Sequence, residues 1–326
     1  MKNKSVKNEK PICSISLDLD NQWSYLKIHG DNGWQSFPSY LDIFVPHILE
    51  ILDELKLKIT FFVVGQDVAL DKNKHAFEMI NDRKHEFGNH SFSHESWLHL
   101  YSKDKIQEEI VKTNDVICKI TNTTPIGFRG PGFSWSSDLL KVLYKNNFIY
   151  DASTLPTFIG PFARAYYFKT ADLNEEEKKT RSGLFGSFMD GFKPLKPYLW
   201  KLNSEDSLLE IPVSTIPLIK IPFHLSYLIY LSRFSKNIMN FYLQTAIKMC
   251  KLMKVSPSFL LHPLDLIGGD KIKELIFFPG MNLNSSKKLE IFFSVIREFQ
   301  KNFWLVNMST HAETEMNKSN LSIKKL

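Results

Sequence analysis

The chain has 326 residues, of which 23% are charged and 43% are hydrophobic. This much apolar surface excludes an extended disordered chain, and only 14 Gly and 15 Pro exclude a collagen-like or low-complexity protein. No run of about 18 apolar residues is present, so the sequence predicts no transmembrane helix.

The formal charge of +6 is concentrated at the two ends of the chain. Residues 1–10 carry four Lys and one Glu, and residues 318–326 carry three Lys, so the body between them is neutral. A neutral body argues against nucleic acid as a partner. We expect flexible tails at 1–10 and 312–326 around a catalytic domain at 11–311. The N-terminus lacks an apolar signal-peptide core, which favours a cytoplasmic location.

Short apolar runs alternate with longer amphipathic segments along the chain. Strands are expected at 12–20, 58–64, 85–89, 125–129, 148–152, 208–213, 258–262 and 303–307. Helices are expected at 40–56, 66–83, 103–121, 137–147, 237–254 and 285–300. This alternation predicts an α/β fold with a parallel sheet, as either a barrel or an open sheet.

Two segments depart from the alternation. Residues 155–207 contain an aromatic run, a charged run and a segment interrupted by Gly and Pro. Such a composition is typical of an insertion or lid. Residues 216–234 are the most apolar stretch of the chain. A buried helix or strand pair is the favoured interpretation of this stretch. The alternative is an interfacial helix that makes peripheral contact with the inner face of a membrane.

Carboxylates and imidazoles stand at the ends of predicted strands. Asp18 and Asp20 lie two residues apart at the end of the first strand, so their side chains share one face. His90 and His94 follow the third strand in HSFSH, where a four-residue spacing on a helical turn brings two imidazoles to one side. One Asp and two His leave coordination positions open for catalysis. These ligands suit Zn²⁺, with Co²⁺ and Ni²⁺ as alternatives.

Arg129 and His262 follow two further predicted strands. Arg129 opens RGPGF, in which a Pro and a Gly fix the backbone, and beside Asp18 it would keep that carboxylate ionised. His262 ends the apolar run SFLLHP. A structural histidine is the alternative there, but an imidazole that faces a metal is suited to proton donation.

The five motifs DLD, HSFSH, RGPGF, YDAS and LLHP occur in this order over residues 12–265. In this order the sequence resembles the polysaccharide deacetylase (NodB-homology, carbohydrate esterase 4) family. The resemblance implies a distorted (β/α)7-type barrel, one divalent metal ion, and hydrolysis of N-acetyl groups on an amino-sugar substrate.

The resemblance also implies roles for individual residues. The implied metal ligands are Asp20, His90 and His94. The implied catalytic residues are Asp18 as base, Arg129 as its orienting partner and His262 as acid. The implied pocket residues are Pro131, Gly132 and Phe133. Asp151 in YDAS is a candidate support residue, and a structural role at the end of a strand is the alternative for it. The family's usual first motif has adjacent aspartates, whereas Leu19 intervenes here, so the division of roles between Asp18 and Asp20 stays open.

The function expected from this resemblance is removal of an N-acetyl group from an amino sugar by metal-activated water. The expected substrate is a cytosolic or lipid-linked glycan precursor. One alternative is a deformylase or allantoinase-like amidohydrolase of the same fold. The other is a non-catalytic carbohydrate-binding relative.

Overall fold

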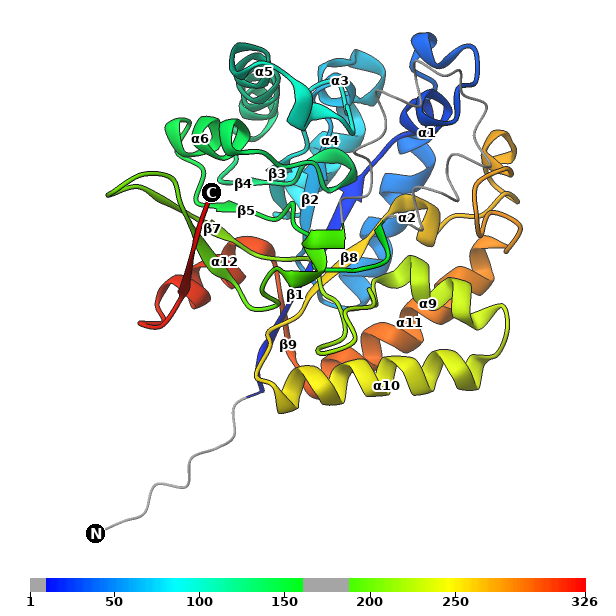
Figure 1. Cartoon of the computed structure of the whole chain (residues 1–326). Coiled ribbons are helices and arrows are strands. Elements are labelled where there is room, and N and C mark those ends of the chain that lie inside the picture. The colour runs from blue at the N-terminus through cyan, green and yellow to red at the C-terminus, as the bar shows by residue number, and fades with distance from the viewer. Residues whose placement is uncertain (1–9, 161–187) are drawn as a thin grey trace.

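A computed structural model describes residues 10–160 and 188–326 of the chain (Figure 1). Nearly all of the expected tail at 1–10, and most of the aromatic and charged runs of the expected insertion at 155–207, lie outside these residues. No helix within the two described ranges combines the length and the hydropathy that crossing a bilayer requires.

Seven parallel strands form the centre of the molecule. In spatial order they are β8 (Ser258–Leu261), β1 (Ile12–Leu19), β2 (Thr60–Val63), β3 (Glu86–Asn89), β4 (Gly127–Phe128), β5 (Tyr150–Asp151) and β7 (Ser207–Glu210). β1 is buried along all but its first residue, as expected for a parallel strand covered on both faces. The remaining strands lie at the margins: β6 (Tyr198–Lys201) beside β7, β10 (Ser322–Lys325) beside β6, and β9 (Trp304–Val306) beside β1.

The two ends of the seven-strand row meet just beyond β7. The backbone N–H of Ser214 donates to the Ser258 carbonyl at 3.2 Å, and the Ser258 N–H donates to Ser214 Oγ at 2.6 Å. The row therefore curls into a barrel closed by a short irregular contact. This is the distorted (β/α)7-type barrel that the resemblance implied.

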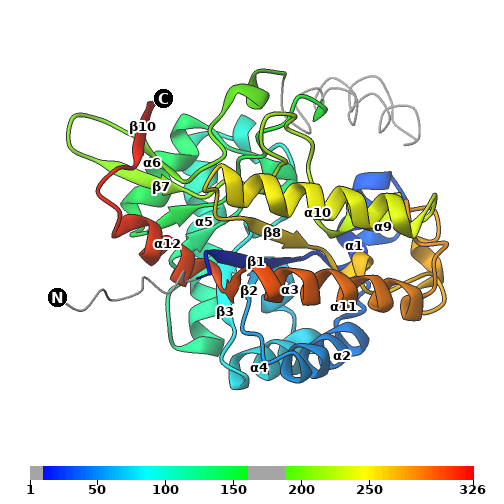
Figure 2. The same cartoon turned by 90° about the horizontal axis from the view of Figure 1, so that it is seen from below.

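Helices surround the barrel (Figures 1 and 2). They are α1 (Gln22–His29), α2 (Leu41–Glu54), α3 (Gly65–Ala69), α4 (Lys74–Asp82), α5 (Lys103–Thr121), α6 (Ser137–Lys145), α9 (Leu225–Ser232), α10 (Lys236–Leu252), α11 (Ser285–Asn302) and α12 (Met308–Met316). Each long helix buries one apolar face. In α11, for example, Phe299 packs against Phe259 of β8 with ring centroids 4.6 Å apart.

The structure differs from two expectations about the ends and the apolar stretch. Residues 312–326, expected as a flexible tail, hold the end of α12 and the strand β10. Met308 and Ala312 of α12 enter a core cluster with Phe62, and this burial holds the segment in place. Within 216–234, the helix α9 buries one face and exposes the other, so the stretch is neither fully buried nor fully interfacial.

The segment 66–83, expected as one helix, is broken into α3, a 3₁₀ turn at Asp71–Asn73 and α4. The break coincides with a tertiary contact, because Ser39 Oγ donates to Asn73 Oδ1 at 2.8 Å. The helix α1 was not expected from the sequence. It begins at Asn21, whose side chain accepts from the Gln22 N–H at 2.8 Å as an N-cap.

Candidate functional site

The predicted site residues follow the carboxyl ends of β1, β3, β4 and β8. Asp20 follows β1, His90 follows β3, Arg129 follows β4 and His262 follows β8. Because parallel strands place their carboxyl ends at one edge of a barrel, these residues lie at one mouth of the molecule.

Asp20, His90 and His94 form a compact, buried cluster. One potential ligand atom of each lies within 4.8 Å of those of the other two. Asp20 Oδ1 is 2.9 Å from His94 Nε2 and 3.5 Å from His90 Nε2. Burial alone would raise the pKa of Asp20, but the adjacent imidazoles of His94 and His90 hold it well below its usual range.

The cluster fits a divalent metal ion. Across residues 10–160 and 188–326, Asp20 Oδ1 and the ring nitrogens of His94 have no hydrogen-bond partner outside this cluster. Buried polar atoms without partners are costly, and a cation bound between Asp20 Oδ1 and one ring nitrogen of His94 would satisfy both of these atoms. One carboxylate oxygen and two imidazole nitrogens leave coordination positions for water and substrate.

The ring of His90 is oriented by the RGPGF loop. His90 Nδ1 lies 2.6 Å from the backbone carbonyl oxygen of Arg129. A carbonyl only accepts, so Nδ1 carries the proton and Nε2 presents its lone pair towards Asp20. This is the ring state that a metal ligand requires.

The two histidines are joined by an irregular loop, not by the helical turn that their spacing predicted. Ser91 and His94 have left-handed φ values of 60° and 51°. Glu109 of α5 holds this loop, because its Oε2 accepts from the N–H groups of Phe92 at 2.9 Å and Ser93 at 2.8 Å. Sequence reasoning missed Glu109. Its signal is a carboxylate on the apolar face of an amphipathic helix, where a charged side chain needs a partner.

A second support lies behind Asp20. The buried Asp67 Oδ1 accepts from Asn21 Nδ2 at 2.7 Å and from Trp23 Nε1 at 2.9 Å. Asn21 directly follows Asp20, and the Trp23 ring meets the His94 ring edge-on at 6.4 Å. Burial raises the pKa of Asp67 to about 7. Sequence reasoning placed Asp67 in an ordinary helix and missed this role.

Arg129 is fully buried beside Asp18. Its Nη1 donates to Asp18 Oδ1 at 2.7 Å and to Ser16 Oγ at 2.9 Å, and its Nε donates to the Ala152 carbonyl at 3.0 Å. The guanidinium carbon also lies 4.5 Å from the centre of the Phe62 ring. The structure thus joins Arg129 and Asp18 as the sequence predicted.

The RGPGF loop forms a tight turn at the mouth. Gly130 is required, because a Cβ there would lie 2.0 Å from the Ser134 carbonyl oxygen. Pro131 is buried, whereas Gly132 is exposed and Phe133 is half-buried. The turn therefore presents Gly132 and Phe133 to a molecule that enters the mouth.

His262 lies partly open at the mouth, with 23% of its side chain exposed. Asp265 Oδ2 accepts from the His262 backbone N–H at 2.9 Å and lies 3.7 Å from ring Nδ1. Burial lowers the pKa of His262, but the hydrogen bond and charge of Asp265 outweigh it and raise the pKa to about 9. A protonated imidazole at this position is able to act as a general acid. Sequence reasoning missed Asp265, although an acidic residue three positions after the histidine was visible.

His224 is a second imidazole near the mouth that sequence reasoning missed. Its ring lies 6.1 Å from the His262 ring and 4.7 Å from the Tyr227 ring. Burial lowers the pKa of His224 to about 3, so the ring is neutral. It forms a wall beside His262.

Asp151 lies behind the RGPGF loop. It hydrogen-bonds Ser153 Oγ, which in turn accepts from the Gly130 N–H at 2.8 Å. Burial raises the pKa of both Asp151 and its neighbour Glu210. Asp151 thus supports the loop of Arg129 from below.

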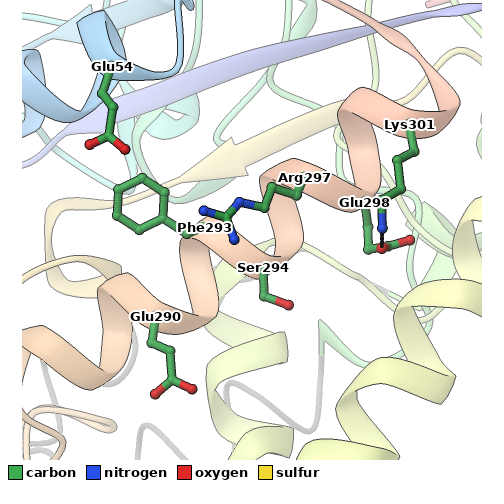
Figure 3. Close-up of a pocket in the computed structure, with 7 residues that line it drawn as sticks. All are labelled: Glu54, Glu290, Phe293, Ser294, Arg297, Glu298 and Lys301. Atoms are coloured by element: carbon green, nitrogen blue, oxygen red, sulfur yellow. Dashed lines mark hydrogen bonds and ion pairs between the residues drawn. The ribbon is translucent and has the colours of Figure 1, made fainter.

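A groove on the outer surface is separate from this mouth. It runs between the end of α2 and the helix α11 (Figure 3). Its lining residues are Glu54, Glu290, Phe293, Ser294, Arg297, Glu298 and Lys301. These residues carry both signs of charge and include none of the predicted site residues.

Comparison with known proteins supports the motif assignment. Residues 30–150, which include both site histidines and Arg129, match the family model of polysaccharide deacetylase. A peptidoglycan deacetylase of Helicobacter pylori is 26% identical over 168 residues, 49% of this chain and 54% of that protein. A chitooligosaccharide deacetylase of Rhizobium leguminosarum bv. phaseoli is 34% identical over 100 residues, 29% of this chain and 42% of that protein. The chain therefore spans about half or less of these curated relatives.

The solved structures agree with the fold. A crystal structure from Mycobacterium smegmatis, described as a polysaccharide deacetylase, has a TM-score of 0.60 at 18% identity, covering 98% of this chain and 95% of that chain. Together these matches confirm the resemblance to the polysaccharide deacetylase (NodB-homology, carbohydrate esterase 4) family that the motifs indicated.

Proposed function

We propose that this protein is a metal-dependent carbohydrate N-deacetylase, which hydrolyses the acetamide of an amino sugar to acetate and a free amine. The observation that carries the proposal is the meeting of a buried Asp–His–His cluster with the Asp18–Arg129 pair at one mouth. Relatives named as deacetylases of peptidoglycan and of chitooligosaccharides support the substrate class.

Asp20, His90 and His94 would hold the ion, for which Zn²⁺ is our first choice and Co²⁺ or Ni²⁺ the alternatives. A divalent ion bound there supplies Lewis-acid polarisation of an acyl carbonyl and makes water more acidic. Asp18 accepts the proton of the attacking water. Arg129 fixes Asp18 for this task through the bond to Oδ1, which leaves the second oxygen of the carboxylate for the proton.

His262 completes the reaction by protonating the departing nitrogen. An amine leaves poorly unless it receives a proton as the C–N bond breaks. Asp265 favours the protonated ring of His262 and holds it at the mouth. Gly132 and Phe133 would contact the sugar, and Phe133 offers an apolar surface to its ring.

The narrower proposal concerns the substrate and the location. We place the enzyme in the cytoplasm, in contact with the inner face of a membrane, acting on a lipid-linked amino-sugar precursor. An apolar and basic surface on α9 and α10, described below, supports this choice.

The test is acetate release from N-acetylglucosamine oligomers by the purified protein, before and after removal of metal by a chelator. We expect release that disappears with the metal and returns with added Zn²⁺. His94→Ala should remain inactive at every metal concentration. Release of formate from N-formyl substrates without acetate release would favour a deformylase instead. If the metal-loaded protein bound the oligomers but released no acetate, a carbohydrate-binding protein would be favoured instead.

A further inference from the structure

One long stretch of the chain carries only positive charge. Residues 211–264 contain six Lys and Arg residues and no Asp or Glu, although the whole chain has 35 acidic residues. This stretch includes α9 and α10, which lie next to each other on the outside of the barrel (Figure 2). The outer surface of these helices therefore has a single sign of charge.

The same two helices expose a row of large apolar side chains. Tyr230, Phe234, Ile238 and Phe241 are 53%, 68%, 51% and 76% exposed. Tyr230 lies in the last turn of α9, Phe234 in the turn between the two helices, and Ile238 and Phe241 in the first half of α10. The rings of Tyr230 and Phe234 are in contact, with centroids 5.3 Å apart. Single exposed apolar residues are ordinary, but such a row marks a binding surface. We call these four residues the α9–α10 stripe.

Cations lie along the stripe without partners of opposite charge. Arg233, Lys248 and Lys251 are exposed, and none of them forms an ion pair with any residue that the structure describes. Lys236 differs, because its ammonium pairs with Glu290 of α11 at 2.5 Å. The charges of these three cations are therefore not neutralised within the described residues, although Lys251 also donates to the uncharged Asn302 Oδ1 at 3.1 Å.

The neighbouring helix α11 shows what an ordinary outer surface of this protein looks like. In the groove of Figure 3, Glu298 pairs with Lys301, and Glu290 and Arg297 lie nearby. The charges there are mixed and partly neutralise one another. The combination of an apolar row and unpaired cations thus distinguishes α9–α10 from α11.

We propose that the α9–α10 stripe docks on the surface of an anionic lipid bilayer. Exposed aromatic and aliphatic side chains enter the headgroup boundary, while flanking cations meet lipid phosphates. The argument for a bilayer, and not a protein partner, is this charge complementarity along an amphipathic helix pair. The docking does not rest on the proposed enzymatic function.

The docking surface and the candidate site share the helix α9. This helix begins after His224, whose ring lies 6.1 Å from that of His262. Eight helical residues span only about 12 Å, so the mouth lies close to the stripe. A membrane-docked molecule would therefore hold its mouth near the headgroups, where a lipid-linked sugar is presented.

The test is co-sedimentation of the full chain with vesicles of phosphatidylcholine, with and without phosphatidylglycerol. We expect binding only to the vesicles that contain phosphatidylglycerol, weakening as salt is added. The double variant Phe234→Glu/Phe241→Glu should lose binding. Lys248→Glu should weaken it at least about five-fold, since each cation near an anionic surface contributes about that factor.

Matched controls separate this surface from general charge and hydrophobicity. Ile43→Glu replaces a side chain of α2 that is 50% exposed, and this variant should bind vesicles more tightly than Phe234→Glu/Phe241→Glu does. Lys301→Glu reverses a charge on α11, and this variant should bind more tightly than Lys248→Glu does. Circular dichroism of each variant would verify folding. Absence of wild-type binding, or undiminished binding by Phe234→Glu/Phe241→Glu, would overturn the proposal. So would a stripe-dependent dimer without vesicle binding, which would make the stripe a self-association surface.

Discussion

The ring of His90 and the backbone of Arg129 are joined by a hydrogen bond of 2.6 Å between Nδ1 and the carbonyl oxygen. Through this bond the loop that fixes the guanidinium beside Asp18 also fixes a candidate metal ligand. Asp18 and the Asp20–His90–His94 cluster are therefore held by the same loop, and a change in the loop should affect both.

Gly130→Ala tests this coupling. The added Cβ would lie 2.0 Å from the Ser134 carbonyl oxygen, so the loop must move. Overpacking of this kind typically costs about 1–3 kcal/mol of unfolding free energy. Because His90 would lose its acceptor, we also expect weaker metal binding, measured by titration. Gly33→Ala is the control: its Cβ meets nothing within 4 Å, so it should strain only the local backbone and leave metal affinity unchanged.

Glu109→Ala should weaken metal binding without touching a ligand. Glu109 accepts from two backbone N–H groups between the histidines, and loss of such outer support typically lowers metal affinity about 10- to 100-fold. Isothermal titration with Zn²⁺ measures the change. Glu108→Ala, one residue away and exposed, is the matched control and should bind as the wild type does. Equal affinities for both variants would remove Glu109 from the site.

Substitutions of Asp18 should separate its structural role from its chemical role. Asp18→Ala leaves the buried Arg129 without its carboxylate, and breaking a buried pair in this way costs about 3–5 kcal/mol. Asp18→Asn keeps an oxygen for the guanidinium and should cost less in urea unfolding. Both variants should lose about 10²-fold or more in turnover, because neither has a base. A fully active Asp18→Asn would transfer the role of base elsewhere.

Asp265→Asn should change the pH dependence of turnover. The carboxylate of Asp265 raises the pKa of His262 to about 9, so the ring of the wild type stays protonated through neutral pH. As an acid, His262 loses activity when the pH rises through its pKa. Removal of the carboxylate lowers this pKa, so the alkaline limb of the rate profile should move to lower pH. An unmoved limb would show that another group supplies the proton.

The strand–helix alternation was sufficient to predict a parallel α/β fold and the residues that follow its strands, whereas the barrel was predicted from the family resemblance. Strand ends are local features, since β1 reads as a buried run that ends in DLD and β3 leads directly into HSFSH. Parallel topology then brings Asp20 and His94 to one edge without further information. The predicted contact between Arg129 and Asp18 follows from the same geometry.

The hydrogen-bond partners of the supporting residues could not be predicted in this way. Glu109 and Asp67 act through backbone and indole N–H groups that are distant in sequence, and no periodicity encodes those meetings. The same holds for the break at Asp71–Asn73, where Asn73 accepts a tertiary hydrogen bond from Ser39 and the helix is interrupted. His224 reached the mouth through a loop that has no regular pattern. These positions depend on the assembled barrel.

The central claim is that Asp20, His90 and His94 together hold one divalent ion. Elemental analysis of the purified full chain, with folded Asp20→Ala measured alongside, tests this claim most directly. We predict one divalent ion per wild-type chain and almost none in Asp20→Ala. An Asp20→Ala protein that retains a full equivalent of metal would contradict the account.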